Sequence, residues 1–97
     1  MSHPAIKEIV LDVLKFHSPS MPEFATYLCE LEYIDSVDIS LVEMDEKTDS
    51  MKVVIHGEGI DFNGMKDHMV KHGVYIHSVD NIAVSYTHLT LPTILLV

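Results

Sequence analysis

Basic residues are scarce in this chain. Six lysine or arginine residues stand against fifteen aspartate and glutamate residues, which gives a formal net charge of −9. This charge repels both a nucleic-acid backbone and an anionic membrane surface, so we expect neither as a partner. It would attract cations, and it would also simply keep the protein soluble.

Cysteine is nearly absent as well. Cys29 cannot form a disulfide within the chain, and its place in a helical pattern predicts a small buried thiol. The first four residues lack the basic and apolar regions of a signal peptide, and every apolar run is too short to span a bilayer. We therefore expect a cytoplasmic protein.

Motifs of two common enzyme classes are also missing. No serine has the flanking glycines of a nucleophile elbow, and no glycine-rich loop is suited to binding phosphate. The 97 residues make one domain, with room for a two-layer core but not for a deep enclosed active site. We expect function at a surface or between subunits.

The strongest structural signal is the stretch from Ile6 to Phe16, which is rich in aliphatic residues on both of its alternating faces. Such a run predicts a central strand. Asp12 stands out because it lies between Val10 and Leu14 on one face, where the pattern favours an aliphatic residue. This carboxylate is the first functional candidate.

The remaining pattern predicts five further elements. Ser20 and Glu23 form a capping box before a helix, and Gly73 ends a second, shorter helix that Asn63 begins. Alternating residues predict three more strands. The expected elements are a helix from Met21 to about Glu32, strands over Val37–Glu43 and Met51–His56, a helix over residues 63–72, and a strand over Val74–Ala83.

This order predicts a ferredoxin-like α+β fold, βαββαβ, with a four-stranded antiparallel sheet in the order 4-1-3-2. Both helices cover one face and leave the other open. The side chains expected on the open face are Glu8, Val10, Asp12, Leu14, Val42, Val54, His56, Tyr75, His77 and Val79.

The segment Val84–Thr93 does not fit this domain. Its ten residues match the translation of a transposase adaptor used for sequencing libraries, GTC TCT TAT ACA CAT CTG ACG CTG CCG ACG. We therefore expect one domain over residues 1–83 and a non-native, adaptor-derived tail over residues 84–97. The alternative is a genuine apolar terminal strand, and either kind of tail could pair with a sheet edge.

Three blocks of the predicted strands resemble an archaeal family catalogued as domain of unknown function 211. They are Ile9–Lys15, Leu41–Asp45 with Thr48, and Ile76–Asp80. The likeness covers Ile6 to about Ala83. One departure is Phe16, which stands where the family usually has proline before the histidine, here His17.

The resemblance implies a ferredoxin-like subunit that assembles into closed homo-oligomers, in a family without an established activity. It assigns no catalytic residue. The residues that match family-pattern positions, without roles, are Asp12, His17, Glu43, Asp45, His77, Ser78 and Asp80.

The first candidate site combines Asp12, His56 and His77, with His17 and Asp38 as further members. If the first and third strands are parallel neighbours, these groups approach one end of the open face. Two imidazoles and a carboxylate suit a divalent transition metal such as zinc. A proton-sensitive interface, a small-ligand site or a hydrogen-bonded structural cluster are the alternatives.

Two weaker candidates follow. The acidic hairpin suits calcium or magnesium, although it lacks the pattern of an EF-hand loop, and a solvated turn is the alternative. Its residues are Glu43, Asp45, Glu46 and Asp49. His68 and His72, four apart on the second helix, could chelate zinc or lie on a solvated helix face.

Together these patterns predict a non-enzymatic, homo-oligomeric binding or regulatory module that takes a cation or small ligand at subunit junctions. The apolar side chains of the open face would be covered by another copy of the chain. The alternatives are a small metal-dependent enzyme that uses Asp12, His56 and His77, and a purely structural assembly protein.

Overall fold

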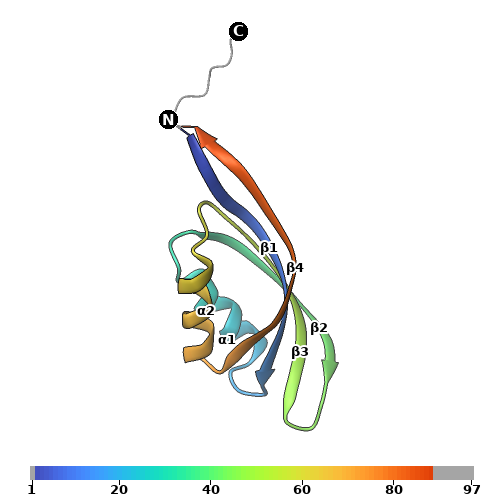
Figure 1. Ribbon diagram of the computed structural model, residues 1–97. Coiled ribbons are helices and arrows are strands. Elements are labelled where there is room, and N and C mark those ends of the chain that lie inside the picture. Colours follow the sequence, from blue (N-terminus) through green and yellow to red (C-terminus); the bar gives the residue numbers. More distant parts are fainter. Residues whose placement is uncertain (1, 89–97) are drawn as a thin grey trace.

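The computed structural model of the chain describes residues 2–88. Its elements follow the order strand, helix, strand, strand, helix, strand (Figure 1). They are β1 (Ser2–Phe16), α1 (Met21–Cys29), β2 (Ile34–Met44), β3 (Thr48–Gly57), α2 (Phe62–Lys71) and β4 (Val74–His88).

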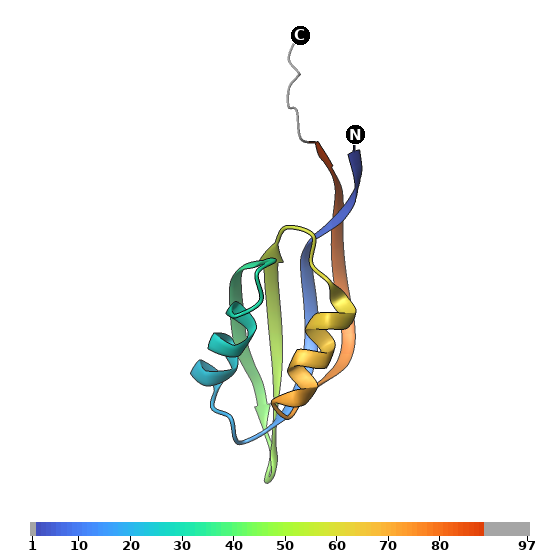
Figure 2. The ribbon, with the colours of Figure 1, turned by 90° about the vertical axis from the view of Figure 1, so that its left-hand side faces the viewer.

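The four strands form one antiparallel sheet in the order β2-β3-β1-β4. Both helices lie on the same face of it, α1 toward β2 and α2 toward β4 (Figure 2). No helix from residues 2–88 lies on the opposite face (Figure 1). The predicted ferredoxin-like α+β fold is confirmed, and the central position of β1 agrees with its apolar character on both faces.

The expectation that the first and third strands are parallel was wrong. β1 and β3 pair antiparallel, with Val10 opposite Val54 and Asp12 opposite Lys52. The reason is topological. The crossover through α1 makes β2 run in the direction of β1, and the hairpin then reverses the chain, so β3 runs against β1.

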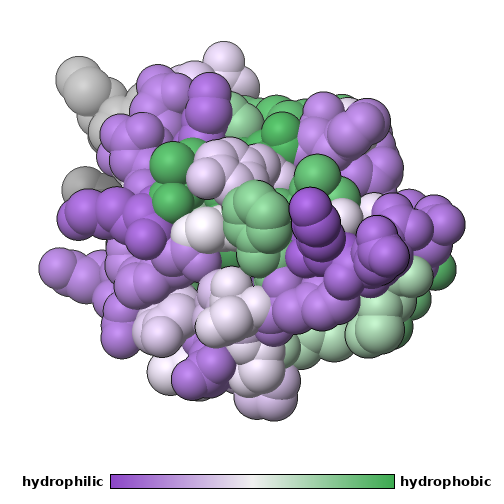
Figure 3. Space-filling view, turned by 90° about the horizontal axis from the view of Figure 1, so that it is seen from below, coloured by the Kyte–Doolittle hydropathy of each residue, from purple (hydrophilic) through white to green (hydrophobic). Residues whose placement is uncertain are grey.

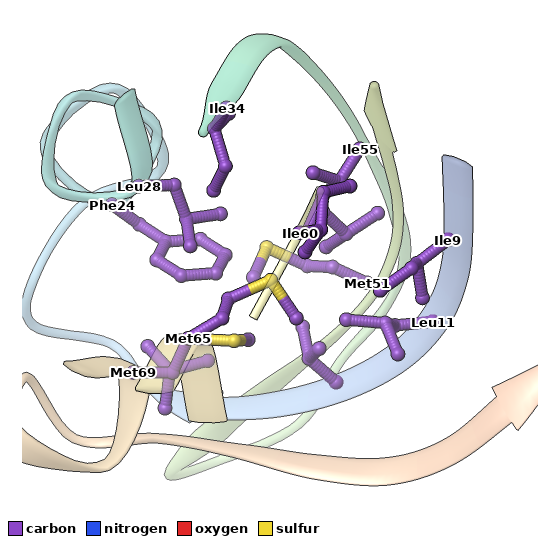
Figure 4. Close-up of a cluster of buried hydrophobic side chains, with 13 residues drawn as sticks. Ile9, Leu11, Phe24, Leu28, Ile34, Met51, Ile55, Ile60, Met65 and Met69 are labelled. Carbon is purple, nitrogen blue, oxygen red and sulfur yellow. The ribbon is translucent and has the colours of Figure 1, made fainter. Parts of the chain in front are cut away.

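The core lies between the sheet and the two helices, and Figure 4 draws its side chains and labels ten of them. Every second residue of β1 and β3 faces it, as the two-residue period of a strand requires. The buried apolar residues are Ile9, Leu11, Val13, Phe24, Leu28, Ile34, Met51, Val53, Ile55, Ile60, Met65, Met69 and Val74.

The helix caps decide where α1 and α2 begin. Ser20 and Glu23 form the predicted capping box. α2 is capped by Asp61 instead of Asn63, because the Asp61 carboxylate accepts the backbone N–H of Gly64 at 3.1 Å.

The C-terminal end of α1 differs from the expectation. The helix stops at Cys29 instead of Glu32, because the next backbone N–H groups bond to carbonyls three residues back, as in a tight final turn. The Cys29 thiol, expected to be buried, is exposed at this end.

β1 and β4 are longer than predicted. The backbone of Val84–His88 continues β4 and pairs with residues 2–6 of β1, and the two strands extend together beyond the helices (Figure 1). The predicted adaptor origin of residues 84–97 stays a prediction, and residues 89–97 lie outside the described residues. Neither helix in residues 2–88 combines the length and apolarity needed to cross a membrane.

Candidate functional site

A shallow pocket of about 240 Å³ lies on the open face of the sheet. It combines two carboxylates and an imidazole with aliphatic side chains. Its lining residues are Asp12, Val13, Leu14, Val42, Glu43, Ser50, Met51 and His77. We call it the open-face pocket.

Two irregularities in strand pairing shape this pocket. On β4 the register shifts where Asp12 pairs with Ser78 and Val13 with Ile76, which leaves His77 as an extra residue. On β2 the register shifts around Val42 in the same way. An extra residue bends a strand and redirects side chains. His77 at one bulge and Val42 and Glu43 at the other line the same pocket as Asp12.

Asp12 belongs to a small polar cluster beside the pocket. The Ser78 hydroxyl donates to Asp12 Oδ2 at 3.2 Å and also lies 3.2 Å from Asp80 Oδ1. A hydroxyl has one proton, so it can satisfy one carboxylate at a time. Lys52 Nζ, 3.8 Å from Asp80 Oδ2, brings a cation to the cluster.

The structure brings together only part of the first predicted site. Asp12 and His77 share the open-face pocket. His56 pairs with Glu8, and its Nε2 lies 3.7 Å from the Glu8 carboxylate. Since Glu8 is four residues from Asp12 along β1, His56 is displaced by about 13 Å.

The other members of that set are dispersed. Asp38 is exposed on β2, opposite Val54. Val79 was expected on the open face, but it pairs with the buried Leu11 and therefore shares the helix side, while Ser78 takes the position across from Asp12. These misplacements follow from the wrong strand direction and from the bulges, which sequence alternation does not reveal.

His17 lies at the far end of β1, against the β2–β3 hairpin. Its Nε2 is 3.0 Å from the backbone oxygen of Asp45 and 3.5 Å from Asp49 Oδ1. Asp49 is buried and pairs with the buried Lys15 at 2.9 Å. This cluster joins the end of β1 to the hairpin.

The acidic hairpin residues do not converge. Glu43 lines the open-face pocket, Asp45 and Glu46 are exposed, and Asp49 is held by Lys15. Viewed from below, this end of the molecule is mostly hydrophilic with scattered hydrophobic patches (Figure 3). These separate carboxylates therefore differ from those of a calcium loop, where several oxygens meet at one point.

The helix layer holds a further cluster. Glu30, His68 and His72 place one potential metal-ligand atom each within 4.8 Å of one another, and they are the one such trio in the described part of the chain. The histidine pair was visible in the sequence, but Glu30 was not. Its approach depends on how α1 packs beside α2, which no local pattern encodes.

The fold perturbs the acidity of the Tyr33 phenol. Burial, followed by the nearby negative charge of Asp61, raises the pKa of the Tyr33 phenol above its ordinary value of 10.0. The phenol therefore stays protonated at neutral pH. It lies on the helix side, near Gly64, and takes no part in the open-face pocket.

Comparison with known proteins agrees with this fold and these sequence blocks. The family described as DUF211, an uncharacterised ArCR family, matches residues 7–90, so the match continues past Ala83. The uncharacterised protein MJ0319 of Methanocaldococcus jannaschii is 39% identical over 77 residues, which are 79% of this chain and 79% of that protein. The chain belongs to the DUF211 family, as its strand sequences predicted.

Proposed function

We propose that this protein is a non-enzymatic binding or regulatory module that assembles with copies of itself and takes a divalent cation or small ligand at the junction. The observation that carries the proposal is that Asp12, Glu43 and His77 all line one pocket, on the sheet face that no element of residues 2–88 covers. Carboxylate oxygens suit calcium or magnesium, and the added imidazole nitrogen extends the choice to zinc.

The neighbouring carboxylates support a cationic ligand. Asp12 and Asp80 share one Ser78 hydroxyl, and a single lysine approaches them. A bound cation would relieve the repulsion between the two carboxylates, and the overall charge of −9 favours its approach. The pocket is shallow, so a second subunit or water would complete the ligand shell.

The apolar surroundings of the pocket support self-association. Phe16 and Tyr75 contact each other edge to face across β1 and β4, at a centroid distance of 6.4 Å, and both are exposed. Val42 on β2 is 64% exposed. Aromatic and aliphatic side chains on an uncovered sheet favour contact with another apolar surface, and a second copy supplies an identical one.

Titration calorimetry with calcium, magnesium and zinc tests the cation. We expect wild-type protein to bind at least one of these ions, and Asp12→Asn and Glu43→Gln each to weaken that binding by at least about tenfold, since each removes one charged ligand from the pocket. The matched control is Asp38→Asn, an exposed carboxylate on β2. Equal affinity in Asp12→Asn and wild type would contradict the proposal.

A small metal-dependent enzyme is the second candidate, and the specific observation in its favour is that Asp12 and His77 line one pocket. His56, the third residue predicted for this enzyme, lies away from the pocket and pairs with Glu8. Stoichiometric transition metal in purified protein that disappears in Asp12→Ala favours the enzyme, while calcium-dependent stabilisation that Asp12→Ala leaves intact favours the hairpin carboxylates. A purely structural assembly protein would show neither.

A further inference from the structure

The Glu30, His68 and His72 side chains meet where the C-terminal ends of the two helices come together. Glu30 is the C-cap of α1 and His72 the C-cap of α2, with His68 one turn earlier. Their potential ligand atoms lie within 4.8 Å of one another. This place is on the helix side of the sheet, apart from the open-face pocket.

The His68 ring is held by the other helix. Its Nε2 lies 2.7 Å from the backbone oxygen of Tyr27, one of the last carbonyls of α1. Because a carbonyl oxygen only accepts, the ring proton sits on Nε2, and Nδ1 keeps the lone pair that a metal needs. Metal-binding histidines are commonly oriented by such a bond from the second ring nitrogen.

The His72 ring is fixed by two aromatic contacts. It stacks on the Tyr27 ring at a centroid distance of 3.8 Å and an interplanar angle of 13°. Its edge contact with the His68 ring has a centroid distance of 4.9 Å. Both imidazoles are therefore positioned by packing before any ligand arrives, which lowers the entropy lost on binding.

Glu30 supplies the third donor, and its side chain can adjust its position because it is exposed. Its carboxylate lies 3.6 Å from the protonated Nε2 of His68, so it must turn toward Nδ1 to share a metal with that ring, and its side chain is 57% exposed. Ligand atoms around a tetrahedral zinc lie about 3.4 Å apart, given bond lengths near 2.1 Å. Rotation of the exposed Glu30 side chain can close most of the difference from 4.8 Å.

We infer that Glu30, His68 and His72 form a binding site for zinc or a chemically similar divalent transition metal. Two imidazoles and one carboxylate are an established zinc donor set that leaves a fourth position for water. Imidazole nitrogen favours zinc, cobalt, nickel and copper over calcium and magnesium. The metal joins the end of α1 to α2 and adds a contact between the two helices.

Cobalt is the probe for this site, because tetrahedral cobalt absorbs visible light far more strongly than the hydrated ion. We expect one cobalt per chain with a tetrahedral spectrum, and zinc should displace it. His68→Ala and His72→Ala should remove this signal, and Glu30→Gln should lower the affinity by at least about tenfold. His56→Ala and Asp38→Asn are matched controls outside both candidate sites, and they should bind cobalt as wild type does.

Circular dichroism without metal checks that each variant is folded. If removal of a histidine prevents folding, nitrogen NMR of the wild-type protein replaces it, and zinc should shift the ring nitrogens of His68 and His72 while leaving those of His56 unchanged. The three-ligand site is overturned if wild type gives only the spectrum of hydrated cobalt, or if any one of the three folded variants retains wild-type affinity.

Discussion

Lys15 and Asp49 form the most deeply buried ion pair of the described residues. Lys15 Nζ also donates to the backbone oxygen of Phe16 at 3.1 Å, so its charge is well satisfied although its side chain is 1% exposed. Asp49 Oδ1 has no hydrogen-bond partner within the described chain, apart from the longer approach of His17. The Asp49 charge therefore depends mainly on Lys15.

We predict that Lys15→Met lowers the free energy of unfolding by about 3–5 kcal/mol, because it leaves the Asp49 carboxylate buried without its cation. Urea unfolding at neutral pH measures the change. Replacing both residues, as in Lys15→Met with Asp49→Leu, should recover most of the loss, since an apolar pair needs no desolvated charge.

Lys7→Met is the matched control. Its ion pair with Glu58 is short, at 2.6 Å, but the two side chains are 35% and 60% exposed. Removing it should cost less than about 1 kcal/mol. Equal free energies of unfolding for Lys15→Met and Lys7→Met would contradict the role of burial in the contribution of the Lys15–Asp49 pair.

At the scale of elements, the end of β3 is the tightest junction in the fold. Gly57 pairs with Ile34 at the start of β2, and the next residue, Glu58, donates its backbone N–H to the Tyr33 oxygen at 3.0 Å. A Cβ at Gly57 would overlap the same Tyr33 oxygen. The close approach of two backbone segments therefore requires glycine at this position.

We predict that Gly57→Ala destabilises the protein by about 1–3 kcal/mol or more, because a backbone atom cannot move aside as a side chain can. Gly59→Ala is the comparison. Gly59 has open space around it, and a φ of +65° is its sole obstacle, which costs an alanine about 1 kcal/mol. In thermal unfolding, the Tm of Gly57→Ala should be lower than that of Gly59→Ala. The reverse order would show that the junction relaxes easily.

At the scale of the whole molecule, the two faces of the sheet differ. One face is covered by α1 and α2, and no element from residues 2–88 covers the other (Figure 1). Leu14 and Val42 line the open-face pocket, and Tyr75 pairs with Leu14. A sheet with one apolar face uncovered is a common contact surface between identical subunits.

We predict that Val42→Glu shifts the protein toward the monomer, because a carboxylate would have to be buried at the contact. Light scattering over a range of concentrations measures the mass. Val70→Glu is the control, since Val70 is an exposed valine on α2, at the helix layer. A wild-type protein that is monomeric at every concentration would contradict the proposed assembly.

Local patterns determined most of the architecture. The alternation in β1 and β3 predicted which residues face the core, and the Ser20 and Glu23 capping box placed the start of α1. Such signals involve residues within a few positions of one another, so they can be read along the chain. They also singled out Asp12 and His77, which the structure brings into one pocket.

Tertiary structure decided how those elements meet. The antiparallel direction of β3 sent His56 to Glu8, and His77, at a bulge in β4, lines the same pocket as Asp12. The pairing of Lys15 with Asp49 and the approach of Glu30 to the α2 histidines have the same origin. Strand register, bulges and helix packing depend on contacts between residues far apart in the sequence, so local periodicity alone does not determine them.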